Sequence, residues 1–207
     1  LWGVVAIVLL LAINTIRDPG YLAIDLAESG RLTGNPVDIL RTSAPLLMIA
    51  LGMTLVIATG GIDLSVGSAM VIAGAVSMEL LRAGDGSVGS AFAALGLALL
   101  ITAVLGAVNG LLVAVVGLQP FITTLVTMLA GRGLAKVITE GQNTSASNDA
   151  FRWIANGTVL GAPVVFLLAL AILVVVVVLV RSTALGMLIE SIGIDPKASR
   201  MAGIDRR

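Results

Sequence analysis

The amino-acid sequence predicts an all-α, polytopic bundle of membrane-spanning helices. Its 207 residues are 58% hydrophobic and only 12% charged, and the mean hydropathy is +1.10. Soluble domains carry roughly 25% charged residues. Three stretches contain no Asp, Glu, Lys or Arg: residues 42–62, 86–131 and 153–180. A helix needs about 20 apolar residues to cross the hydrocarbon core, so these stretches are long enough to span a bilayer.

Six spans are expected along the chain. The first, residues 1–16, is a little short, and the absence of a basic n-region and an Ala-x-Ala site favours a truncated span over a signal peptide. Pro45 suits the first turn of the second helix, and Pro120 can start the fifth. The five later spans are expected at about residues 44–59 (or 44–62), 63–82, 91–116, 121–139 and 163–180.

Two polar connections and a polar tail separate and follow these spans. The connections cover residues 17–41 and 140–162, and the middle of the first, residues 21–30, is expected to form a short amphipathic helix on the membrane surface. The tail, residues 181–207, holds the largest set of Lys and Arg beside any span. The excess of basic residues predicts a cytoplasmic tail. Six spans then place the N-terminus in the cytoplasm and both connections outside.

Composition also excludes several kinds of chemistry. The sequence has no Cys and no His, so disulfides, thiol chemistry, His-based acid–base pairs and the usual zinc or haem sites are not expected. The net charge is zero and no basic tract occurs, which argues against nucleic-acid binding. We therefore expect no catalytic residue, no metal and no cofactor in this chain.

A short helix is predicted within the tail, over residues 195–203. Asp195 can accept hydrogen bonds from the free amides of a helix start, Pro196 fits the first helical position, and Gly203 is a natural stop. The helix offers few bulky apolar side chains for lipid, so we expect it to dock into another protein on the cytoplasmic side. The residues expected to serve that contact are Asp195, Pro196, Lys197, Arg200 and Gly203.

Four sequence blocks resemble one known family. They are GMTLVIATGGIDLSVGS (residues 52–68), VNGLLVA (108–114), QPFITTL (119–125) and TALGMLIESIGIDPKASRMAGI (183–204). Together they resemble the permease subunit of ABC transporters that import monosaccharides, of the ribose and galactofuranose type. That permease has about ten spans. The resemblance therefore implies that residues 1–207 form one permease domain truncated at both ends, holding its first six spans.

The resemblance also implies partners. A pore is formed by two permease copies in the bacterial inner membrane, two ATPase subunits drive it from the cytoplasm, and a periplasmic sugar-binding protein delivers the monosaccharide. The short helix at residues 195–203 corresponds to the coupling helix that contacts the ATPase. The sequence contains no G-x-x-x-x-G-K-[ST] motif, so ATP hydrolysis is expected in the ATPase partner and this chain is not expected to be an enzyme.

A polar break at residues 59–65 is the candidate translocation site. In one interpretation Asp63 only caps the next helix, by accepting from the amide of residue 65 or 66. In the other, glycine leaves backbone groups open to the hydroxyls of a sugar, and the break lines the path. Whether it sits at the cytoplasmic mouth or deeper stays open. The path residues in this second interpretation are Thr59, Gly60, Gly61, Asp63 and Ser65.

Other polar residues within the spans have simpler expected roles. Arg132 and Lys136 share one helix face. Lys136 is expected to reach the lipid headgroups, and Arg132 to bond helix carbonyls or a carboxylate. Asn109, Gln119, Thr123 and Thr124 are expected to form hydrogen bonds between helices.

Two rival functions remain at this point. An ion-coupled secondary transporter also uses broken helices, but it normally needs several acids within the membrane, and Asp63 alone is available. A membrane scaffold without transport would need neither the polar break nor a docking helix.

Overall fold

The computed structural model describes residues 2–27, 30–201 and 203. Within this range, it describes only the backbone of Pro196 and Lys197. Two compact units are distinguished. The first comprises Leu1–Leu47 with Trp153–Ile172, and the second comprises Met48–Arg152 with Leu173–Arg207.

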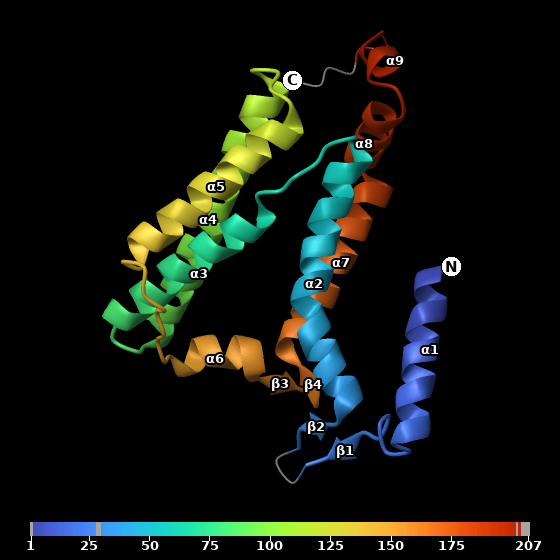
Figure 1. Cartoon of the computed structure of the whole chain (residues 1–207), viewed down its shortest axis with the longest axis vertical. Helices are drawn as coiled ribbons and strands as arrows, with labels where there is room; N and C mark the ends of the chain where they lie inside the picture. Colours follow the sequence, from blue (N-terminus) through green and yellow to red (C-terminus); the bar gives the residue numbers. More distant parts are fainter. Residues whose placement is uncertain (1, 28–29, 202, 204–207) are drawn as a thin grey trace. The chain divides into compact units, whose positions relative to one another are not determined.

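Helices dominate the described chain (Figure 1). They are α1 (Trp2–Arg17), α2 (Asn35–Ala58), α3 (Val66–Ala83), α4 (Val88–Ala114), α5 (Pro120–Ile138), α6 (Asp149–Asn156), α7 (Val164–Ser182), α8 (Ala184–Ile194) and α9 (Pro196–Met201). Among the described residues, α2, α3, α4, α5 and α7 are long and apolar enough to cross a membrane. The predicted all-α polytopic fold is therefore confirmed. At 16 residues, α1 coincides with the predicted first span but is shorter than these five.

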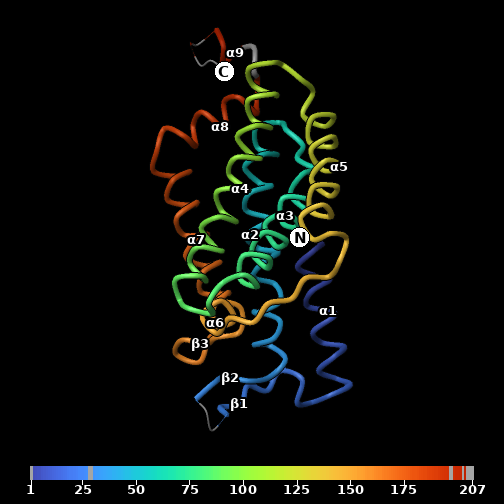
Figure 2. Tube along the Cα trace, turned by 90° about the vertical axis from the view of Figure 1, so that its left-hand side faces the viewer, coloured from blue at the N-terminus to red at the C-terminus, as the bar shows by residue number. Residues whose placement is uncertain are grey.

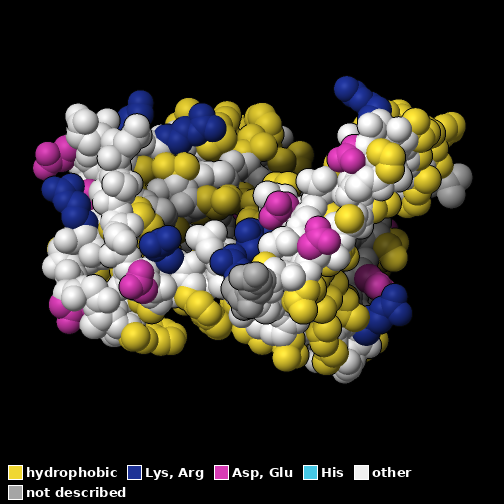
Figure 3. Space-filling model, turned by 90° about the horizontal axis from the view of Figure 1, so that it is seen from below, with side chains coloured by type: hydrophobic (Ala, Val, Ile, Leu, Met, Phe, Trp, Pro, Cys, Tyr) yellow, Lys and Arg dark blue, Asp and Glu magenta, His cyan; other side chains and the backbone are white. Residues whose placement is uncertain are grey.

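The spans carry many apolar side chains on their outer surfaces. In α7, Val174, Val175 and Val178 are each more than half exposed, at 54%, 56% and 52%. A water-soluble protein rarely exposes contiguous apolar surface of this kind. Figure 3 looks onto one end of the molecule, where acidic and basic side chains are spread among hydrophobic ones. Apolar helix flanks are the pattern that lipid contact requires.

The second unit is built on the three neighbouring helices α3, α4 and α5 (Figures 1 and 2). Its core holds Ile72 and Ala75 of α3 against Ala135 of α5. The helices α3 and α5 approach closely at Gly131, where an added Cβ would lie only 2.9 Å from the Cβ of Ser68. Small residues at such crossings let membrane helices pack closely. This bundle holds the candidate site.

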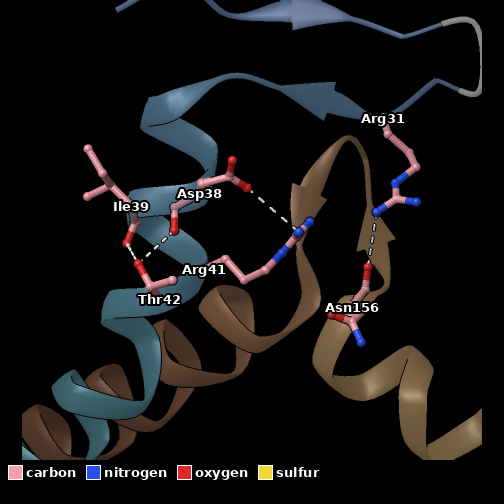
Figure 4. Close-up of polar contacts among 6 residues, drawn as sticks. All are labelled: Arg31, Asp38, Ile39, Arg41, Thr42 and Asn156. Carbon is pink, nitrogen blue, oxygen red and sulfur yellow. Dashed lines mark hydrogen bonds and ion pairs between the residues drawn. The ribbon is translucent and has the colours of Figure 1, made fainter. Parts of the chain in front are cut away.

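In the first unit the two polar connections meet. Strands β1 (Asp25–Leu26) and β2 (Leu32–Thr33) form one antiparallel hairpin, and β3 (Thr158–Val159) and β4 (Ala162–Pro163) form another. The Leu32 amide donates to the Gly161 carbonyl at 3.3 Å, and Arg31 Nη2 donates to the Asn156 carbonyl at 3.3 Å (Figure 4). The parts of the two connections that belong to this unit, residues 17–41 and 153–162, therefore contact each other.

The prediction of an amphipathic helix at residues 21–30 is wrong. The Asp18 carboxylate accepts from the Gly20 amide at 3.0 Å, and the Tyr21 amide donates to the Asp18 carbonyl at 2.9 Å. The Asp-Pro-Gly sequence thus makes a turn, and the chain continues into β1. Local turn chemistry outweighs the amphipathic pattern here.

The expected start of the second span is also wrong. Helix α2 begins at Asn35, so Pro36 stands in its first turn and Pro45 lies inside the helix. The polar first turns are held together by an Arg41–Asp38 ion pair at 3.7 Å and by Thr42 Oγ1, which donates to the Asp38 carbonyl at 2.8 Å (Figure 4). Because these residues are polar, their sequence is typical of a connection between spans, although they are part of the helix.

Candidate functional site

The helix α2 ends in a glycine cap. The Gly60 amide donates to the Ile57 carbonyl at 2.9 Å, and the Gly61 amide donates to the Val56 carbonyl at 3.0 Å. This pair of bonds is a Schellman motif, which requires a left-handed residue after the helix. Gly60 has φ +75°, a conformation that glycine adopts without steric cost. The Thr-Gly-Gly sequence therefore terminates α2 in the manner of a helix C-terminus.

A non-helical link leads from this cap to α3 (Figure 1). Within it, Asp63 Oδ1 accepts from the Ser65 amide at 2.7 Å and from Ser65 Oγ at 2.6 Å. The Asp63 carboxylate thus satisfies a free amide at the start of α3, as its interpretation as a helix cap predicted for residue 65. Asp63 itself is half-buried.

A hydrogen-bond network joins the α2–α3 link to the neighbouring helices α4 and α5. Asn109 Nδ2 donates to Ser65 Oγ at 2.9 Å, and Thr127 Oγ1 donates to Asn109 Oδ1 at 2.6 Å. Thr124 Oγ1 donates to the Ile62 carbonyl at 3.3 Å. Ser65 and Asn109 are only 5% and 6% exposed. The predicted interhelical role of Asn109 is confirmed, and Thr124 bonds the link itself.

The two halves of the polar break lie at different depths in the bundle. Asn109 stands five residues before the end of α4 at Ala114, which corresponds to about 8 Å along the helix. Ser65 bonds it there, whereas Thr59 and Gly60 follow directly on the end of α2.

The end of α2 borders a cavity of about 570 Å³. The cavity is lined by Thr59, Gly60, Gly61, residues 113–120 of the α4–α5 turn, Ile192 of α8 and Arg200 of α9. The structure therefore brings three expected path residues and one expected coupling residue to one place. Asp63 and Ser65 are not among the described residues that line it.

The short helix α9 has the ends that its sequence predicts. Asp195 Oδ1 accepts from the Ala198 amide at 3.1 Å, and Ser199 Oγ donates to the Ser191 carbonyl of α8 at 2.7 Å. Beyond the helix, Gly203 has φ +85° and its amide donates to the Arg200 carbonyl at 3.1 Å. The cap and the stop are confirmed. The side chains of Pro196 and Lys197 lie outside the described part of the chain.

Sequence reasoning missed α8 and its contact with α2. At Gly193 of α8, an added Cβ would lie 2.0 Å from the Ala58 carbonyl oxygen at the end of α2. Only glycine allows backbones to come this close. A glycine near the end of a short apolar helix was the available signal, but its partner could not be read from the sequence.

The chemistry of the site is that of hydrogen bonding. It offers hydroxyls, carboxamides and glycine backbone groups, with one carboxylate that is already bonded to Ser65. Among the residues that the structure describes, no group of three His, Cys, Asp or Glu side chains could hold a metal ion. Such a set of groups suits contact with a hydroxylated solute.

Five long apolar helices, one of them followed by a polar break, define a multi-pass helical membrane protein. The chain belongs to the family described as "Branched-chain amino acid transport system / permease component", whose family model matches residues 35–207. The resemblance to an importer permease is thereby confirmed.

Several relatives match almost all of the chain. It is 50% identical to the fructose import permease protein of Bifidobacterium longum over 208 residues, which are 98% of this chain and 57% of the relative. It is 42% identical to the galactofuranose transporter permease protein of Escherichia coli over 203 residues, 98% of this chain and 58% of that one. The ribose import permease protein of Escherichia coli is 34% identical over 207 residues, 98% of this chain and 60% of that one.

The chain thus spans less than two thirds of the length of these relatives. Identity is higher to the fructose permease than to the galactofuranose permease, so the galactofuranose-type resemblance does not select one sugar. No solved structure matches the chain.

Proposed function

We propose that this chain is the membrane-spanning permease part of an ATP-driven importer, which carries a monosaccharide into the cytoplasm across the bacterial inner membrane. The relatives are named as fructose, galactofuranose and ribose import permeases, and all three sugars are monosaccharides. The observation that carries the proposal is the shared cavity. Arg200 of the short tail helix and the Gly60–Gly61 break line the same space.

The path through the protein would begin at this break. Thr59, Gly60 and Gly61 present a hydroxyl and backbone groups to the cavity, and these groups can exchange hydrogen bonds with the hydroxyls of a sugar. Asp63 and Ser65 would lie further along, where Asn109 fixes their orientation. Weak, exchangeable bonds of this kind let a solute pass without being trapped.

Coupling to ATP hydrolysis would pass through the tail. We assign Asp195, Pro196, Lys197, Arg200 and Gly203 to the contact with a partner ATPase. Movement of α9 would reach α8 through the Ser199–Ser191 bond, and α8 would pass it to the end of α2 at Gly193. Rigid helices joined by close backbone contacts can transmit such a displacement.

The remaining partners follow from the same proposal. A second permease copy would complete the pore, and a periplasmic sugar-binding protein would deliver the substrate. The two hairpins that meet in the first unit would lie on the delivery side, because the tail with its basic residues is assigned to the cytoplasm.

Uptake measurements in whole cells test this function. Cells lacking the gene would be complemented with the full-length permease and supplied with labelled fructose, ribose or galactofuranose. Leucine serves as the contrast, because the family description names branched-chain amino acid transport. We expect uptake of a sugar that survives a protonophore and a sodium ionophore while ATP is maintained, and that stops when ATP is depleted.

Two results would contradict the proposal. Uptake that collapses with the ion gradients at normal ATP would indicate an ion-coupled transporter. Uptake of leucine, with none of the three sugars, would move the substrate to the amino-acid class.

A further inference from the structure

A second cavity, of about 610 Å³, lies between α3 and α5. Its lining includes Val71 and Met78 of α3, Arg132 and Lys136 of α5, and Asn143 and Thr144 from the segment that follows α5. None of these residues belongs to the candidate translocation site. One wall is thus apolar and the opposite wall carries two positive charges.

The two cations need a negative partner. Arg132 and Lys136 are four residues apart, so they stand one above the other on the same helix face, where like charges repel. Within the part of the chain that the structure describes, neither side chain has an ion pair or a hydrogen bond. The described lining residues include no acidic side chain. A cation in a membrane span is costly unless a charge partner or water reaches it.

The cavity also holds an unpaired hydroxyl. Thr144 Oγ1 is buried and has no hydrogen-bond partner among the described residues. The side chains of Gln142 and Asn143 line the same space and carry amide donors. Two cations with a hydroxyl and carboxamides form a donor set suited to an oxyanion with several acceptor oxygens.

The position of the cavity along α5 points to lipid. The helix has 19 residues, or about 28 Å, which matches the thickness of the hydrocarbon core. Arg132 stands six residues before its last residue, Ile138, and thus about 9 Å inside. A long basic side chain at that depth extends to the headgroup layer. Val71, which is 52% exposed on the opposite wall, offers apolar surface to an acyl chain.

We propose that this cavity binds the phosphate of an anionic phospholipid. Arg132 and Lys136 neutralise the phosphate, Thr144 Oγ1 donates a hydrogen bond to it, and the first part of an acyl chain lies along α3. A carboxylate from a soluble partner would meet the same cations, but it would have to enter below the headgroup layer and cover an apolar wall. The lipid satisfies both walls at once. This site does not depend on the transported solute.

Native mass spectrometry of the full-length permease tests the proposal. The probes are phosphatidylglycerol and, as the zwitterionic contrast, phosphatidylcholine, each added to delipidated protein. A basic side chain near the membrane surface contributes about a factor of five to the affinity for anionic lipid. Arg132→Gln and Lys136→Gln should therefore each lower phosphatidylglycerol retention about fivefold and leave phosphatidylcholine unchanged. Arg82→Gln is the matched control, because Arg82 already pairs with Glu79 at 3.7 Å.

A second variant separates binding from folding. Thr144→Val removes the hydroxyl and keeps the shape, so it should lower phosphatidylglycerol retention while the thermal unfolding midpoint in detergent is unchanged. Unchanged retention in Arg132→Gln and Lys136→Gln would overturn the proposal. Loss of affinity for a delivery protein without loss of lipid would assign the cations to a protein contact instead. If inorganic phosphate alone raised the thermal unfolding midpoint as much as phosphatidylglycerol does, the cavity would be a site for a free anion, and the lipid proposal would be overturned.

Discussion

Replacing Gly193 with alanine should weaken the coupling of the tail to α2. The added Cβ would lie 2.0 Å from the Ala58 carbonyl oxygen, and real Cβ atoms essentially never come closer than 3.0 Å to another heavy atom. The end of α8 must therefore move by about 1 Å or more, since neither contact atom belongs to a flexible side chain. Overpacking of this size costs about 1–3 kcal/mol of folding free energy.

The functional consequence follows from the position of α8. Its Ile192 lines the cavity with Arg200 and Gly60, so a displaced α8 moves away from the break. We expect sugar uptake by the full-length permease to fall at least tenfold, because misplacements of about 1 Å cost up to two orders of magnitude in rate. Membrane insertion and co-purification of the partner ATPase should persist.

Gly106→Ala supplies the matched control. Gly106 lies within α4, and nothing stands within 4 Å of an added Cβ there. Alanine in a helix interior is favoured over glycine by about 1 kcal/mol. This variant should therefore transport at the normal rate. Normal uptake by Gly193→Ala, with protein levels equal to those of Gly106→Ala, would refute the transmission of movement through this contact.

Three further predictions concern other parts of the chain. Asn109→Leu removes the amide bonds to the Ser65 and Thr127 hydroxyls, which keep their bonds to Asp63 and to the Thr123 carbonyl, so it should cost about 0.5–1.5 kcal/mol per lost hydrogen bond and lower the thermal midpoint; an unchanged midpoint would show that the network contributes nothing. Arg200→Glu should abolish ATP-dependent uptake while surface labelling shows normal insertion, and undiminished uptake would remove Arg200 from the coupling contact. Glu140 has φ +52°, so Glu140→Gly should raise the free energy of unfolding by up to about 1 kcal/mol, as measured by chemical denaturation, and a decrease would contradict the strain.

Much of the helical framework could be predicted from the sequence, because lipid imposes a minimum length on every span. The predicted spans agree with the five long helices to within four residues at every end except the start of α2. Pro120 does start α5, and Asp195 and Gly203 do bound α9. These are local signals, because each depends on a single residue and the few residues next to it in the sequence.

The predictions that were wrong or incomplete share a different cause. The first turns of α2 are polar, so the sequence predicts a connection there, although Asp38 and Arg41 pair along the helix. The two hairpins form where the connections meet, and that meeting depends on residues more than one hundred positions apart, such as Arg31 and Asn156. Hydropathy describes which segments avoid water and says little about which segments touch.

The candidate site shows the same division. The residue types of the break could be identified from the sequence, and the glycine cap and the Asp63 bond follow from local geometry. The partners of Ser65 could not, since Asn109 lies 44 residues away. The approach of Arg200 to Gly60 likewise arises only when α8 and α9 fold back beside the α4–α5 turn.

The most direct test of the proposed path is thiol labelling at the break. The sequence has no Cys, so Thr59→Cys introduces one reporter in this part of the protein. In a full-length permease without other reactive thiols, the reporter faces the cavity and should react with a small hydrophilic thiol reagent, which should then block sugar uptake. Substrate with ATP should change the labelling rate. Val174→Cys, on the exposed flank of α7, should not react and is the control.

The outcomes are distinct. Labelling at Thr59→Cys that blocks uptake, and that responds to transport conditions, is the predicted result. Full labelling that leaves uptake at its normal rate would contradict the account, because a blocked path cannot conduct its substrate.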